Sequence, residues 1–121
     1  MADANSPNST TDLKVRFTDL AQFAPEKASM AKHRIVGFDS RDPRSRAFNL
    51  LRTTFARKMK EDGHRLVGLT SAAPAAGKSF LSLNLAASLA RVADGPVYLV
   101  DLDIRRASLA EELGFVPERG I

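Results

Sequence analysis

Gly77-Lys78-Ser79 has the residue types and spacing that binding of a nucleoside triphosphate requires. These residues close the run Ala72–Ser79, which lies between an apolar segment and one rich in Ala and Leu. Where a strand turns sharply into a helix, backbone N–H groups and the helix dipole favour a bound phosphate. Gly77 would keep the backbone clear of the ligand, Lys78 would reach the β- and γ-phosphates, and Ser79 would ligate Mg²⁺. We therefore predict a phosphate-binding loop.

The loop departs from the full motif at one position. The complete pattern has Gly where Ala72 stands, so an Ala-rich turn with a solvated lysine is the alternative interpretation. We favour phosphate binding because strand, loop and helix follow in the required order. The predicted nucleotide-binding residues are Ala73, Pro74, Ala75, Ala76, Gly77, Lys78, Ser79 and Phe80.

Two carboxylates follow a second apolar run. Asp101 and Asp103 come directly after Val97–Val100, which suits a buried parallel strand, and ligands of open α/β sheets bind at that end of the strands. Two carboxylates beside a triphosphate need a cation, so we predict a metal site formed by Ser79, Asp101 and Asp103. The alternative is that Asp101 caps the next helix and Asp103 is solvated.

The elements needed to position these residues are two strands and two helices. Residues 65–70 and 97–100 are predicted strands, residues 80–89 a helix, and a further helix is expected from Asp42-Pro43 to Asp62-Gly63. Phe48, Leu51, Phe55 and Met59 recur at helical spacing in the latter and are predicted to face the core. The expected fold class is α/β: a parallel sheet of the P-loop NTPase type, flanked by helices. With 121 residues, the sheet is expected to be truncated after its second core strand.

From about residue 40 onward the chain resembles the bacterial tyrosine kinases of capsule and exopolysaccharide biosynthesis. The resemblance rests on Ser71, Pro74 and Gly77-Lys78-Ser79, followed by the run Val97–Arg106 with its Asp-x-Asp-x-Arg. The upstream segment 48–55 is similar to a helix that precedes the loop in that family. The family commonly has Gly where Ala75 stands, and its tyrosine-rich tail is absent. The sole tyrosine, Tyr98, is predicted to be a core residue of the second strand.

The resemblance implies an ATP- and Mg²⁺-dependent protein tyrosine kinase. Lys78 and Asp101 would then be catalytic, with Asp101 accepting the proton of the substrate tyrosine. The implied partners are ATP, a protein tyrosine substrate and a membrane-embedded polysaccharide co-polymerase adaptor, and a homo-oligomer is possible. The implied location is cytoplasmic, peripheral at the inner face of the plasma membrane. No nucleic-acid partner is expected.

Two further functions stay open. One is a nucleotide-dependent ATPase switch of the partitioning or division type, although such proteins usually carry a second lysine where this chain has Ala73. The other is a truncated, non-catalytic regulatory subunit that binds a membrane adaptor.

Composition and charge limit the remaining possibilities. The chain has no cysteine, which excludes disulfides and thiol catalysis. Residues 1–40 are polar and are predicted to form a partly disordered leader, whereas residues 41–121 form the N-terminal portion of the nucleotide-binding domain. The excess positive charge lies between residues 41 and 62, where a solvated helix face is the simplest interpretation.

Overall fold

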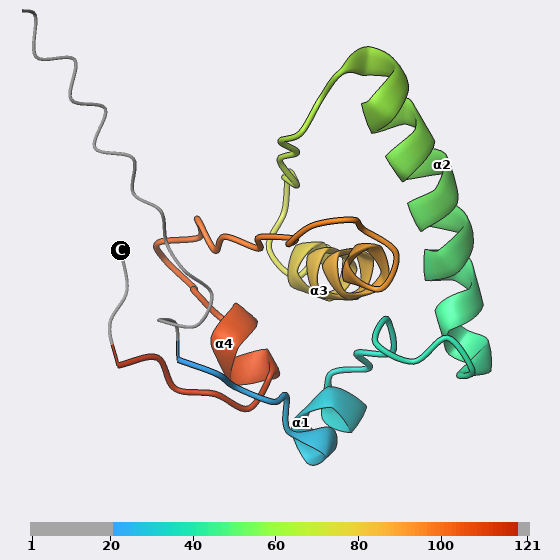
Figure 1. The fold of residues 1–121 in the computed structure, drawn as a ribbon. Coiled ribbons are helices and arrows are strands. Elements are labelled where there is room, and N and C mark those ends of the chain that lie inside the picture. Colours follow the sequence, from blue (N-terminus) through green and yellow to red (C-terminus); the bar gives the residue numbers. More distant parts are fainter. Residues whose placement is uncertain (1–20, 119–121) are drawn as a thin grey trace, which may run out of the picture.

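The computed structural model describes residues 21–118, so the first 20 residues of the predicted, partly disordered leader lie outside that range. Its elements are α1 (Lys27–Lys32), the 3₁₀ turn η2 (Pro43–Ser45), α2 (Arg46–Asp62), α3 (Lys78–Ala90) and α4 (Leu109–Glu112). The two long helices, α2 and α3, contact one another, while the short helices α1 and α4 lie close together at the other side of α3 (Figure 1).

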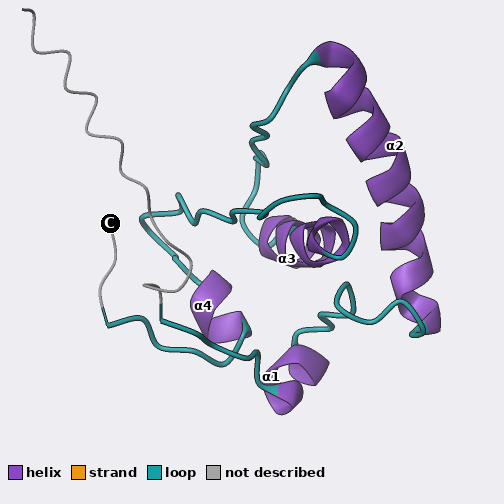
Figure 2. Ribbon diagram, viewed as in Figure 1, coloured by secondary structure: helices purple, strands orange, loops and turns teal. Residues whose placement is uncertain are grey.

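The predicted parallel sheet is wrong. No strand is present between residues 21 and 118, and the segments 65–70 and 97–100 are drawn as loops (Figure 2). Both segments line one cavity, but no backbone hydrogen bond joins them in the described part of the chain. A parallel strand needs a hydrogen-bonding neighbour and cover on both faces. Apolar sequence alone supplies neither, so Leu66 is 91% exposed and Val100 54% exposed.

The assignment of Tyr98 to the core is wrong for the same reason. Its side chain is 69% exposed, because the segment that carries it is not covered on both faces.

The helix predicted from Asp42-Pro43 to Asp62-Gly63 is confirmed. The Asp42 carboxylate accepts the Arg44 backbone N–H at 2.9 Å, and hydrogen bonds from the Arg44 side chain and backbone hold the pKa of Asp42 below its ordinary value. Gly63 ends α2 with φ 69°, a left-handed conformation that glycine adopts without steric cost. Of the predicted apolar stripe, Phe48 is buried whereas Leu51 is 39% exposed.

The core forms where α3 contacts the segment 34–37 and α2. Asn84 of α3 is fully buried, and its Oδ1 accepts the backbone N–H groups of Val36 at 2.7 Å and Gly37 at 2.9 Å. Its amide nitrogen donates to the carbonyl oxygens of Arg34 and Phe80. The buried Asn84 side chain therefore attaches the segment 34–37 to α3.

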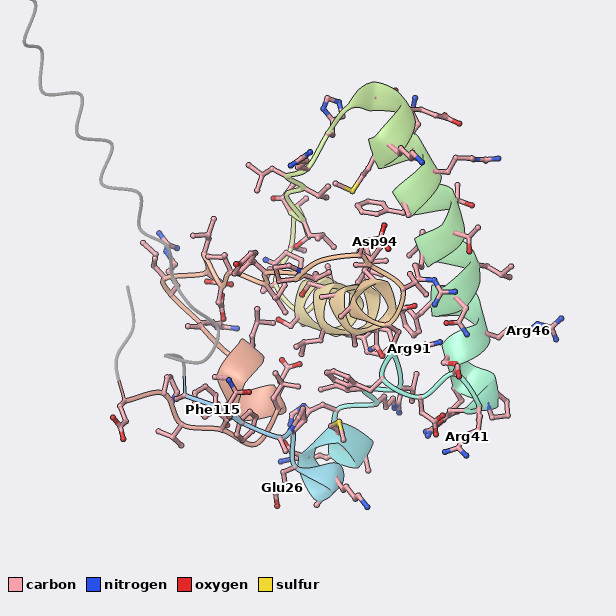
Figure 3. The ribbon with its side chains drawn as sticks, viewed as in Figure 1. Glu26, Arg41, Arg46, Arg91, Asp94 and Phe115 are labelled. Carbon is pink, nitrogen blue, oxygen red and sulfur yellow. The ribbon has the colours of Figure 1, made fainter. Side chains whose placement is uncertain are left out.

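Arg91 connects the same segment to α2. It extends from the end of α3 toward the segment before α2 (Figure 3), and its guanidinium donates to the Gly37 carbonyl at 3.0 Å and to Asn49 Oδ1 at 3.1 Å. Arg52 and Ser88 also donate to Asn49 Oδ1. Polar contacts thus fix the packing of α2, α3 and the segment 34–37.

Helix α1 is held against α4 by backbone and side-chain contacts. The Glu26 N–H donates to the Leu113 carbonyl at 3.0 Å, and the Ser29 hydroxyl donates to the Glu112 carbonyl at 3.0 Å. The rings of Phe23 and Phe115 lie 4.6 Å apart. None of the helices in the described residues has the length and apolar character that a bilayer span requires.

Candidate functional site

The phosphate loop enters α3 through a glycine in the left-handed region. Gly77 has φ 96° and precedes Lys78, the first residue of α3, and no side chain caps this helix end. The first N–H groups of a helix have no partner within the helix. Those of α3 are consequently left to a ligand or solvent, as a phosphate site requires.

Ala75 also has a left-handed conformation, with φ 57°. A side chain makes this region unfavourable by roughly 1 to 2 kcal/mol, and glycine avoids most of that cost. The loop therefore adopts the glycine-like conformation at the position where the sequence has alanine.

We predict that Ala75→Gly raises the free energy of unfolding by up to about 1 kcal/mol, because it removes this strain. Ala76→Gly is the matched control: Ala76 has no positive φ, and glycine there should lower the free energy of unfolding by about 0.5 to 1 kcal/mol. Urea titration of both variants measures the difference. Equal destabilisation by the two changes would contradict the prediction.

Four of the predicted site residues line one cavity in the structure. Lys78, Ser79, Asp101 and Asp103 all line it, and its volume is ≈ 240 Å³. The remaining walls come from residues 66–69 and 98–100 with Ser82, Leu102 and Leu109. These four residues therefore border a common space, although residues 65–70 and 97–100 form no sheet beside it.

The other predicted loop residues contribute differently. Residues 73–77 are exposed but do not line this cavity. The Phe80 ring makes an edge-on contact with Phe48, with ring centroids 5.5 Å apart, and lines a second cavity instead. Phe80 can thus offer its backbone N–H to a phosphate, while its side chain packs against α2.

Both carboxylates also form hydrogen bonds within their own loop. Asp101 Oδ2 accepts the backbone N–H groups of Ser108 at 3.0 Å and Leu109 at 3.2 Å, at the start of α4. Asp103 Oδ1 accepts those of Arg105 and Arg106. Asp101 therefore caps α4, as the alternative interpretation of the sequence expected, while it also lines the cavity with Lys78.

Ser108 and Glu112 adjoin the site through Ser79, and the sequence interpretation missed them. Ser108 Oγ lies 3.3 Å from Ser79 Oγ and donates to Glu112 Oε1 at 3.0 Å. The available signal was the pattern Ser-x-x-Glu from Ser108 to Glu111, which is typical of a helix start. It would have predicted α4 and directed attention to its first turn.

The oxygen donors around the cavity suit Mg²⁺. No group of three or more His, Cys, Asp or Glu side chains able to hold a metal occurs in residues 21–118. Mg²⁺ does not need one, because it is commonly bound by one or two carboxylates together with substrate phosphates and water. The Ser79 hydroxyl and the carboxylates of Asp101 and Asp103 are ligands of that kind.

The chain is similar to two curated proteins, both named "Putative tyrosine-protein kinase EpsB", from Ralstonia solanacearum and Ralstonia nicotianae. Each is 41% identical over 73 residues, which is 60% of this chain but 10% of the relative. The matched part is thus about one tenth of the relatives' length. No protein-family model matches the chain, and no solved structure matches it. The similarity therefore supports a relationship to a named tyrosine kinase over the matched part alone.

Proposed function

We propose that this chain carries the nucleotide-binding part of an ATP-dependent protein tyrosine kinase that acts in capsule or exopolysaccharide biosynthesis. The observation that carries the proposal is the convergence of Lys78, Ser79, Asp101 and Asp103 on one cavity beside the uncapped start of α3. The similarity to proteins named as tyrosine kinases supports the choice of acceptor. ATP and Mg²⁺ are the proposed ligands.

Each residue has a distinct part in the proposed reaction. The Lys78 ammonium and the first-turn N–H groups of α3 bind and orient the β- and γ-phosphates. Ser79, Asp101 and Asp103 would hold Mg²⁺, which offsets the phosphate charge. The tyrosine oxygen bonds to the γ-phosphorus as the bond from that phosphorus to the bridging oxygen breaks; Asp101 takes the phenolic proton and ADP leaves.

The partners follow from the same proposal. The phosphate acceptor is a protein tyrosine, and the membrane contact is a co-polymerase adaptor that holds the protein at the inner face of the plasma membrane. Assembly into a homo-oligomer is part of the proposal as well.

We predict that Lys78→Ala lowers the affinity for ATP about 10- to 100-fold, because a charge-assisted hydrogen bond contributes about 1.5 to 3 kcal/mol. Isothermal titration calorimetry of the chain measures this, and the full-length protein should lose phosphate transfer to a glutamate-tyrosine copolymer. Lys60→Ala removes the same charge from the exposed face of α2, and should leave the ATP affinity and the phosphate transfer unchanged. ATP binding that is equal in all three proteins would refute the proposal.

A nucleotide-dependent switch without phosphate transfer is the second candidate. It is favoured by the hydrogen bonds that occupy Asp101 Oδ2 and Asp103 Oδ1 within their own loop. The two candidate functions predict different tyrosine phosphorylation by the full-length protein. A kinase loses tyrosine phosphorylation with Asp101→Asn, whereas a switch binds ATP and phosphorylates no tyrosine even with Asp101 present.

A further inference from the structure

Ser108 occupies the capping position of α4 but does not cap it. A serine preceding a helix normally accepts a backbone N–H from the first turn. Here the Ser108 side chain makes no such bond, and Asp101 Oδ2 accepts the Ser108 and Leu109 N–H groups instead. The Ser108 hydroxyl is therefore available for its contacts with Ser79 and Glu112.

The direction of these two hydrogen bonds follows from the number of protons. A serine hydroxyl has one proton to donate, and an ionised glutamate carboxylate can only accept. Ser108 Oγ lies 3.0 Å from Glu112 Oε1, so the Ser108 proton is donated to Glu112. In the 3.3 Å contact between the two hydroxyls, Ser79 must then be the donor and Ser108 the acceptor.

This direction affects how Ser79 can act as a ligand. A hydroxyl binds a cation through an oxygen lone pair, so its proton has to point to another acceptor. Ser108 supplies that acceptor, and the lone pairs of Ser79 Oγ remain available. Groups that orient a metal ligand in this way typically change metal affinity or activity 10- to 100-fold when they are replaced.

We propose that Ser108, oriented by Glu112, is a positioning residue that presents the Ser79 oxygen to the divalent cation of a bound nucleotide. This inference rests on the proposed function, since it concerns the cation of the nucleotide complex. It assigns to α4 a task beyond packing: the first turn of this helix sets the hydrogen-bond direction of a side chain at the start of α3.

The test compares ATP affinity with Mg²⁺ and with EDTA, by isothermal titration calorimetry of the intact chain. The ratio of the two affinities isolates the contribution of the cation. Ser108→Ala should reduce this ratio about tenfold and leave the EDTA affinity unchanged. Ser108→Thr keeps the hydroxyl and should restore the ratio to within about twofold.

Two further variants separate positioning from the folding of α4. Ser29→Ala removes the hydrogen bonds from the Ser29 hydroxyl to the Glu111 and Glu112 carbonyls of α4 without touching Ser79, and should leave the ratio unchanged. Glu112→Ala removes the acceptor of the Ser108 proton, so Ser108 can donate to Ser79, and this variant should lower the ratio of the two ATP affinities. Glu112→Gln keeps an acceptor oxygen for Ser108 and should leave that ratio unchanged. If Ser108→Ala fails to fold by circular dichroism, the two Glu112 variants still decide the question.

The outcomes distinguish the inference from the function on which it rests. An unchanged ratio in Ser108→Ala and Glu112→Ala, with the wild-type chain binding Mg-ATP, overturns the positioning role and leaves the proposed function intact. Failure of the wild-type chain to bind ATP in either buffer overturns both.

Discussion

Asn84→Ala is expected to lower the free energy of unfolding by about 3 to 5 kcal/mol, a large part of the stability of a small domain. The side chain is fully buried, and its loss leaves the Val36 and Gly37 N–H groups without their acceptor. A buried polar group without a partner costs roughly 1 to 3 kcal/mol. Both the Val36 and the Gly37 N–H groups would lose their partner here. Urea-induced unfolding, followed by circular dichroism, gives the value.

Ser82→Ala is the matched control for Asn84. Ser82 lies on the same helix, two residues earlier, and its hydroxyl donates to the Ser79 carbonyl within that helix. Its loss should change the free energy of unfolding by less than about 1 kcal/mol. Similar losses for the two variants would mean that Asn84 does not hold the segment 34–37 on α3.

Gly37→Ala is expected to cost about 3 kcal/mol, through steric overlap. A Cβ at this position would overlap the backbone carbonyl oxygen of Asn84 and lie 3.0 Å from the Ala87 Cβ. The carbonyl belongs to α3, so it cannot move without disturbing the helix. Displacement of Gly37 would in turn break the Asn84 hydrogen bonds and the bond from Arg91 to the Gly37 carbonyl.

Gly95→Ala provides the comparison, because a Cβ there meets no atom within 4 Å. We expect a change within about 0.5 kcal/mol for this variant, measured by the same urea titration. The double variant Gly37→Ala, Asn84→Ala should lose less stability than the two single losses together, since each breaks the same contact. Full additivity would show that the two residues act independently.

The helices could be predicted from the sequence because their signals are local. Asp42-Pro43 and Gly63 mark the ends of the η2–α2 segment, and Gly77 precedes α3; each acts through its own dihedral angles or a neighbouring N–H. Local chemistry was therefore a sufficient guide to these helices. Lys78 and Asp101 line one cavity, but the parallel sheet from which their proximity was expected is not formed by the described residues.

The strands failed because pairing is not local. Residues 65–70 and 97–100 have the composition of buried strands, but a ladder depends on a neighbour that composition does not reveal. Asn84 was missed for a related reason. Its partners Val36 and Gly37 lie 48 and 47 residues away, and nothing in the helix sequence indicates that this polar side chain is a buried anchor.

The contact of α1 with α4 joins residues that are far apart in the sequence. Ser29 and Glu112 are separated by 83 positions, whereas hydrogen bonds within α3 span about one helical turn. Closing a long loop costs more chain entropy than closing a short one, and contacts between distant residues form slowly. We therefore expect this pair to form late in folding and to open early on heating. When α4 opens, Ser108 moves away from Ser79. We therefore expect the surroundings of the Ser79 side chain to change at a lower temperature than the hydrogen bonds within α3.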